Sequence, residues 1–170
     1  EFAFSVPLGQ THEVLVVGAD TPIPPSTVQI RGRMGVRGGT TFESTAWELA
    51  ALNPLLEVVV YPGSVGAEAV LDSIVAGAIE FTIEDQNRLD VFLGYRDGIQ
   101  AGPALTTERP LAWAARRQNP ALLTALDEFL HEEHLLGNSH VAAVADLPEL
   151  KKRGRIRMIT RNNAATYFLW

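Results

Sequence analysis

Short β-branched runs alternate with segments of helical periodicity along this chain, and this alternation constrains the fold more than any other feature. Strands are predicted at residues 14–17, 34–36, 56–61, 81–83 and 111–114. Helices are predicted at residues 42–52, 65–76 and 87–93, and from Pro120 onward. Residues 94–109 are polar and glycine-rich, which favours a loop. Strands that alternate with helices form a mostly parallel sheet flanked by helices, so we predict an α/β fold with five strands.

Composition narrows the class of protein. The chain has 170 residues, of which 46% are hydrophobic, enough for one domain or a little more with a core of its own. The net charge of -6 argues against nucleic acid as a partner, because phosphate binding needs clustered Lys and Arg. The chain has no cysteine, which excludes disulfides and thiolate metal sites. No apolar run reaches the roughly 20 residues of a membrane-spanning helix.

Residues 33–43 carry the most informative motif. They are expected to form a short strand, a Gly38-Gly39 turn, the hydroxyls of Thr40 and Thr41, and then a helix. A helix begins with N–H groups that have no partner within the helix, and its dipole is positive there. Such a corner suits a carboxylate or a phosphate, so the motif predicts a site for a small anionic or zwitterionic ligand. A turn followed by a capping threonine is the simpler alternative.

Asp85 follows another predicted strand, and parallel strands end at one edge of the sheet. Ligands of open α/β sheets sit beyond that edge. We therefore expect Thr40, Thr41 and Asp85 to lie near one another. Asp85 could instead cap the helix that follows it.

These motifs resemble a known family. The resemblance runs from about residue 2 to residue 133. Its matching stretches are Phe4-Ser5-Val6-Pro7, residues 14–17, Gly35-Val36-Arg37-Gly38-Gly39-Thr40-Thr41, residues 57–62, residues 76–85 and Pro110-Leu111-Ala112-Trp113-Ala114. Together they resemble family 3 extracellular solute-binding proteins. Their sequence is most similar to the solute-binding-like domain of F-type membrane-bound lytic transglycosylases. The resemblance implies a periplasmic-binding-protein type II fold with two lobes, of which this chain would carry lobe two.

By resemblance, Gly39, Thr40 and Thr41 would hold a ligand carboxylate, and Asp85 would hold its α-ammonium group. Donors at one end and a carboxylate at the other suit a zwitterion. The family's carboxylate-clamping arginine lies in lobe one and has no counterpart that can be assigned here. The expected site is therefore half of a clamp, with no catalytic residue and no cofactor.

Three segments are expected along the chain. Residues 1–135 would form lobe two with its crossover strands, residues 136–154 a linker and short helix, and residues 155–170 a new strand. That strand could open a following tandem solute-binding domain, or it could complete the same domain by circular permutation. Most of lobe one would precede Glu1.

Two motifs suggest chemistry that we reject. The histidines of His131-Glu132-Glu133-His134 are one residue too close for the zinc-protease pattern, so we expect a solvated helix end and no metal. The pair Glu43-Ser44 is reminiscent of the Glu-Ser motif of lytic transglycosylases. The motif's wider context is missing, and an acid in a first helical turn is explained by the helix dipole.

The sequence thus predicts a non-catalytic domain that binds an amino acid, peptide or muropeptide and is either periplasmic or attached to the outer membrane, facing the periplasm. By resemblance it would regulate a cell-wall lytic transglycosylase. A transport receptor for a membrane permease and a spacer domain without ligand are the alternatives. The expected partners are the small ligand, lobe one and a tandem domain, and self-association through the face that lobe one would cover is also expected.

Overall fold

The structure is a computed structural model that describes residues 1–135. The chain divides into two compact units, each described here by itself. Unit 1 combines Glu1–Gly9 with the described residues from Pro110 onward, and unit 2 is the continuous segment Gln10–Arg109. The predicted linker at residues 136–154 and the predicted strand at residues 155–170 lie outside the described residues.

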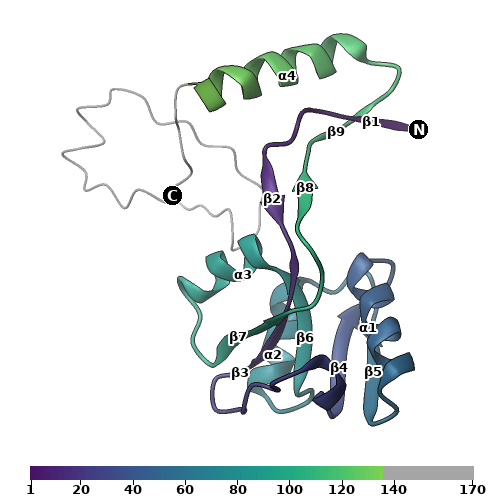
Figure 1. Cartoon of the computed structure of the whole chain (residues 1–170), viewed down its shortest axis with the longest axis vertical. Helices are drawn as coiled ribbons and strands as arrows, with labels where there is room; N and C mark the ends of the chain where they lie inside the picture. Colours follow the sequence, from purple (N-terminus) through teal and green to yellow (C-terminus); the bar gives the residue numbers. More distant parts are fainter. Residues whose placement is uncertain (136–170) are drawn as a thin grey trace, which may run out of the picture. The chain divides into compact units, whose positions relative to one another are not determined.

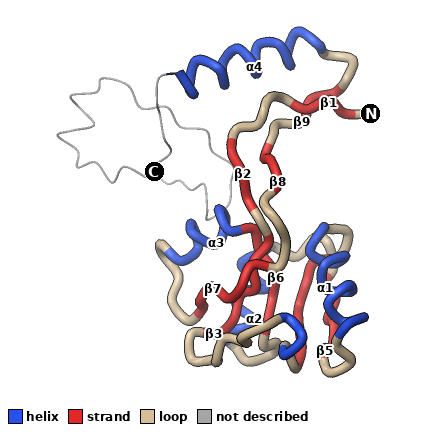
Figure 2. Tube along the Cα trace, viewed as in Figure 1, coloured by secondary structure: helices blue, strands red, loops and turns tan. Residues whose placement is uncertain are grey.

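Unit 2 is built on a five-stranded sheet with helices on both faces (Figures 1 and 2). The strands, in the sheet order β5-β4-β6-β3-β7, are Leu56–Tyr61, Gly32–Arg37, Phe81–Asp85, Glu13–Gly18 and Ile99–Ala104. The helices are α1 (Thr41–Leu52), α2 (Ala67–Val75) and α3 (Gln86–Leu93), with a short 3-10 turn η1 (Thr27–Gln29). This confirms the predicted α/β class of a type II periplasmic-binding-protein lobe.

The sheet is mixed, with one strand reversed. β4 runs parallel to β5 and to β6, whereas β3 is antiparallel to both β6 and β7. The four strands other than β3 therefore point the same way, and "mostly parallel" is the accurate description. Because of this arrangement, the carboxyl ends of β4, β5, β6 and β7 share one sheet edge with the amino end of β3.

Strand β3 shows why the sequence contains an uninterrupted apolar run. Leu15 and Val17 pack into one hydrophobic cluster with Phe42 and Ala46 of α1. The alternate residues of β3 point the other way, because successive side chains of a strand alternate between its faces. They pack with α2 and α3 in a second cluster, whose buried members are Val14, Val16, Val70, Leu71, Ile74, Ile79, Leu89, Phe92 and Ile99. Both faces of this strand are covered, so it carries no polar face.

Two sequence predictions about the last strand were wrong. The loop predicted at residues 94–109 contains β7, a sheet strand in which Ile99 is buried. Gly102 and Pro103 are typical of loops, so their presence led to the wrong prediction. Both are tolerated in β7 because it is an edge strand. The predicted strand at 111–114 is instead parts of two short strands outside the five-stranded sheet, β8 (Arg109–Leu111) and β9 (Ala114–Arg116).

Unit 1 contains few described elements. β1 (Phe2–Phe4) pairs with β9 in antiparallel fashion, and α4 (Pro120–Leu135) follows. Asp127 of α4 accepts a hydrogen bond from the Val6 amide at 2.8 Å, and the Trp113 and Phe129 rings stack with centroids 6.1 Å apart. β2 (Gly9–Thr11) pairs with β8 in a two-stranded sheet.

Candidate ligand site at the carboxyl edge of the sheet

The start of α1 has the geometry that the glycine-threonine motif predicts. Gly39 adopts φ 75°, a left-handed conformation that favours glycine, and turns the chain out of β4. Thr40 is the N-cap residue, with extended backbone, and Thr41 begins the helix. The Thr40 hydroxyl donates to the Arg37 carbonyl at 2.7 Å rather than capping the helix, whereas Thr41 is exposed. Thr41 is thus the hydroxyl of this corner that faces solvent.

A carboxylate of the chain already contacts this corner. Oε2 of Glu43, in the first turn of α1, accepts a hydrogen bond from the Gly39 amide at 2.7 Å. An acid near a helix N-terminus is also favoured by the helix dipole. Glu43 therefore has a local structural function, and it shows that the corner accommodates a carboxylate.

Asp85 ends β6 and precedes α3, at the same sheet edge as Thr40 and Thr41. It is the N-cap residue of α3, yet its side chain makes no capping hydrogen bond. Instead, its Oδ1 accepts from Nη2 of Arg109 at 2.7 Å. The capping alternative for this side chain is therefore wrong, and its principal partner is a cation that the sequence did not suggest.

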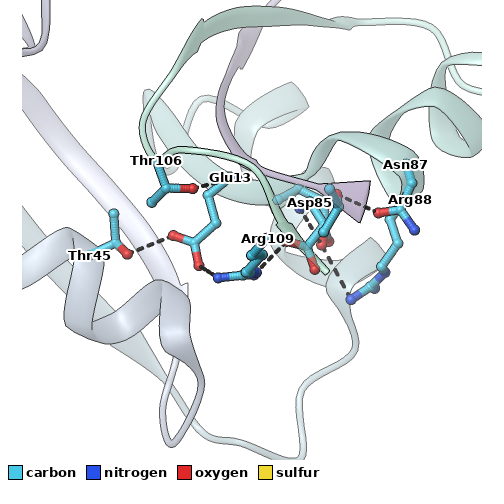
Figure 3. A network of polar contacts seen from close by, with 9 residues as sticks. Glu13, Thr45, Asp85, Asn87, Arg88, Thr106 and Arg109 are labelled. Atoms are coloured by element: carbon cyan, nitrogen blue, oxygen red, sulfur yellow. Dashed lines mark hydrogen bonds and ion pairs between the residues drawn. The ribbon is translucent and has the colours of Figure 1, made fainter. Parts of the chain in front are cut away.

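Arg109 lies between two carboxylates, as Figure 3 shows. Its Nη1 donates to Oε1 of Glu13 at 2.7 Å, while Nη2 contacts Asp85. Burial lowers the pKa of Arg109, but its hydrogen bond with Glu13 and the charges of Asp85 and Glu13 outweigh this and hold the pKa above its ordinary value. The guanidinium is thus a fixed positive charge at the predicted ammonium site.

Glu13 anchors this network from within the core. Its side chain is 1% exposed. The second carboxylate oxygen, Oε2, accepts from the Thr45 hydroxyl of α1 at 2.6 Å, and the Glu13 amide donates to the Thr106 hydroxyl at 2.9 Å (Figure 3). A buried carboxylate is tolerated only when it is paired and hydrogen-bonded, and Glu13 meets both conditions.

Glu84, next to Asp85, points away from it, as strand alternation predicts. It is buried, and burial raises the pKa of its carboxyl despite the nearby charge of Arg88. Oε1 of Glu84 lies 3.2 Å from Nη1 of Arg88 and accepts from the Asp85 amide at 3.0 Å. A small pocket beside it is lined by Arg37, Phe42, Ala67, Val70, Leu71, Thr82, Ile83 and Glu84.

The described residues offer no centre for metal chemistry. Within residues 1–135, no group of three or more His, Asp or Glu side chains could hold a metal ion. His131 is exposed, and its Nδ1 lies 2.8 Å from the Asp127 carbonyl one helical turn earlier. In the same part of the chain, no helix is both long enough and apolar enough to cross a membrane.

Sequence comparison identifies curated relatives of one kind. No protein-family model matches the chain. Membrane-bound lytic murein transglycosylase F of Shewanella pealeana is 32% identical over 138 residues, and that of Shewanella halifaxensis is 30% identical over 138 residues. Each match covers 81% of this chain and 29% of the relative. The chain therefore spans less than a third of the relatives' length, in their solute-binding-like domain.

Structural comparison agrees with the sequence relatives. An ancestral amino acid-binding protein, a precursor of cyclohexadienyl dehydratase, matches with a TM-score of 0.67 and 19% identity, over 81% of this chain and 58% of that one. An amino acid ABC transporter substrate-binding protein from Streptococcus pneumoniae, bound to L-arginine, matches with a TM-score of 0.68 and 16% identity, over 80% and 56%. The chain is therefore a homologue of the solute-binding-like domain of membrane-bound lytic murein transglycosylase F, with the fold of the family 3 solute-binding proteins.

Proposed function

We propose that this chain is a non-catalytic domain that binds an amino acid, a peptide or a muropeptide-like ligand and regulates a lytic transglycosylase. The observation that carries the proposal is the group of polar side chains at one sheet edge of a solute-binding fold. Thr41 faces solvent at the start of α1, and the Asp85–Arg109 pair lies at the same edge. Sequence similarity to the F-type transglycosylases supports the link to cell-wall turnover.

In the proposed site, Gly39, Thr40 and Thr41 hold the anionic group of the ligand. The first N–H groups of a helix have no partner within it, so those at the start of α1 can donate to an anion. Glu43 would give up its bond to Gly39 or share that N–H with the ligand. Asp85 lines the other side of the site. We propose a periplasmic location, with the ligand arriving from the cell wall.

A transport receptor is the second candidate. The Streptococcus pneumoniae structure is a substrate-binding protein of an amino acid ABC transporter, and it shares the fold of this chain. A receptor of that kind would bind free amino acids and contact a permease. A regulatory domain would instead respond to a peptidoglycan fragment.

Calorimetry with matched helix variants tests the proposed site. The ligand panel is the twenty L-amino acids, short peptides and muropeptides, and the proteins are the chain itself, Thr41→Val and Ser44→Ala. Both hydroxyls are exposed on α1, but only Thr41 is its first residue, and Ser44 lies three residues further along the helix. We expect Thr41→Val to weaken binding by about 1 kcal/mol, the net value of one hydrogen bond, and Ser44→Ala to leave it unchanged. Equal effects of the two variants, or no binding of any panel member, would refute the site.

The regulatory part needs a second measurement. In a protein that joins this chain to a transglycosylase domain, a ligand found by calorimetry should change the rate of peptidoglycan cleavage. Thr41→Val should shift the ligand concentration at which the rate changes. A rate that is indifferent to a ligand that binds would favour the transport receptor.

A further inference from the structure

We infer that Arg109 keeps free α-ammonium groups away from Asp85, so that this site selects ligands whose amino end is acylated. The inference deepens the proposed function and rests on it, since it concerns the chemical class of ligand at the same sheet edge. It differs from the expectation drawn from the sequence, in which Asp85 binds the α-ammonium group of the ligand. The reason for the change is the ion pair between Asp85 and Arg109.

The guanidinium is held firmly at Asp85. Its two terminal nitrogens are each 2.7 Å from a carboxylate oxygen, one on Glu13 and one on Asp85. Contacts from both terminal nitrogens to two separate carboxylates fix the plane of the guanidinium, which a single contact to a lysine would not do. Because Glu13 is itself held by Thr45 of α1, the position of Arg109 is set by the sheet and by α1 together.

Displacing Arg109 would leave the buried Glu13 carboxylate without its cation, at a large cost in free energy. The Glu13 side chain is 1% exposed with Arg109 in place, so its carboxylate depends on protein partners rather than on water. A buried carboxylate that loses its partner costs far more than a surface one. A ligand ammonium group that took Arg109's place at Asp85 alone would leave Glu13 unpaired, so only a cation that contacts both carboxylates could displace the guanidinium without that cost.

An ammonium group that approached Asp85 without displacing Arg109 would share a carboxylate whose charge the guanidinium already offsets in part. The Asp85 side chain is 17% exposed, so only a small part of its carboxylate is open to a ligand while Arg109 is in place. Two positive groups on one carboxylate repel each other. An acylated nitrogen carries no charge. It keeps one N–H, which can donate to an unused lone pair of Asp85.

Arg109 also favours an acid elsewhere on the ligand. The guanidinium has five N–H donors, and its side chain is 36% exposed. A ligand with a carboxylate and an amide nitrogen therefore suits this edge better than a free amino acid does. N-acylated amino acids and N-acylated peptides are the chemical class that fits.

The test compares pairs of probes that differ only at the amino group. Each L-amino acid and its Nα-acetyl derivative are titrated into the chain, and amide chemical shifts report the affinity. We expect the acetylated probe to bind at least about tenfold more tightly, a difference equivalent to roughly 1.4 kcal/mol. Free amino acids that bind as tightly as their acetylated forms would overturn the inference, and this comparison needs no variant.

A double variant tests whether Arg109 causes the preference. Glu13→Gln with Arg109→Gln removes the buried pair at unchanged net charge and leaves Asp85 without its cation. The preference for acetylated probes should disappear or reverse. The matched control is Glu84→Gln with Arg88→Gln, which removes the neighbouring pair of a buried glutamate with an arginine, also at unchanged net charge. It should keep the preference.

The outcomes separate this inference from the proposed function. A preference that survives in the Glu13→Gln/Arg109→Gln chain overturns the assignment to Arg109 while binding itself stands. No response to any probe, muropeptides included, contradicts the proposed function and the inference together. Thermal unfolding of each variant confirms that the proteins compared are folded.

Discussion

At the scale of single residues, the candidate site contains charged side chains whose partners are far away in the sequence. Glu13 and Arg109 are 96 residues apart, and Asp85 and Arg109 are 24 apart. The position of Thr40, Thr41 and Asp85 at one sheet edge could be predicted because Asp85 ends a strand and the two threonines follow the turn after another. Glu13 and Arg109 could not, because no local spacing joins them. The one hint was an acid at the start of an apolar run, where a buried charge needs a partner.

Removing the guanidinium should destabilise the fold. We expect Arg109→Met to lower the free energy of unfolding by about 2–3 kcal/mol, because it strands the buried Glu13 carboxylate. The value is below that of a fully buried pair because the Arg109 side chain is 36% exposed. Urea unfolding measures it. The control is Arg117→Met, whose pair with Glu1 is exposed on both sides and should matter by no more than about 0.5 kcal/mol. Equal losses of unfolding free energy in the two variants would show that the buried Glu13–Arg109 pair stabilises the fold no more than an exposed ion pair does.

Glu84 should make stability depend on pH. Burial raises the pKa of Glu84 in the folded chain above the ordinary 4.5. At a pH between 4.5 and that raised pKa, the folded chain keeps a proton that the unfolded chain has released. Its stabilising contribution is present below pH 4.5 and is lost as the pH rises through the raised pKa. Glu84→Gln cannot titrate. Its stability relative to the parent chain should therefore improve as the pH rises from 4.5 towards neutral, and a difference that is constant with pH would contradict the raised pKa.

At the scale of elements, β7 is the part of the fold that sequence patterns failed to show. Four strands of the sheet were predictable, because β-branched and apolar runs between turn residues are typical of strands. β7 has the sequence Ile-Gln-Ala-Gly-Pro-Ala and lacks such a run. It becomes a strand by pairing with β3, whose second edge would otherwise lack a partner. Tertiary pairing therefore overrode local propensity there.

Truncation of Ile99 tests whether β7 belongs to the core. Ile99 is 5% exposed and packs with the cluster beneath α2 and α3. We expect Ile99→Ala to lower the free energy of unfolding by about 2–4 kcal/mol. Val91→Ala on α3, where the side chain is 42% exposed, should change it by no more than about 0.5 kcal/mol. A similarly small effect at Ile99 would mean that β7 is not packed as described.

At the scale of the whole molecule, unit 2 is a continuous segment with a core of its own. Both hydrophobic clusters and the Glu13–Arg109–Asp85 network lie within Gln10–Arg109. Unit 1 instead joins two separate stretches of chain. The candidate site is therefore built from residues of one unit, and unit 2 should carry it alone.

A segment of residues 10–109 should thus fold without the rest of the chain. We expect a single cooperative thermal transition and retained far-ultraviolet circular dichroism, because no buried residue of either cluster lies outside it. A segment that lacks residues 99–109 is the control, and it should lose the transition with β7 and Arg109. A broad, non-cooperative transition for residues 10–109 would mean that unit 2 depends on unit 1.

The most direct test of the central claim is a map of amide chemical-shift changes when a muropeptide is added to the chain. The account predicts changes concentrated at Gly39, Thr40, Thr41 and Asp85, with smaller effects in the sheet below. The start of β5, at the opposite edge of the sheet, should be unaffected. Changes centred at that opposite edge, or none at saturating ligand, would contradict a ligand site at the carboxyl ends of these strands.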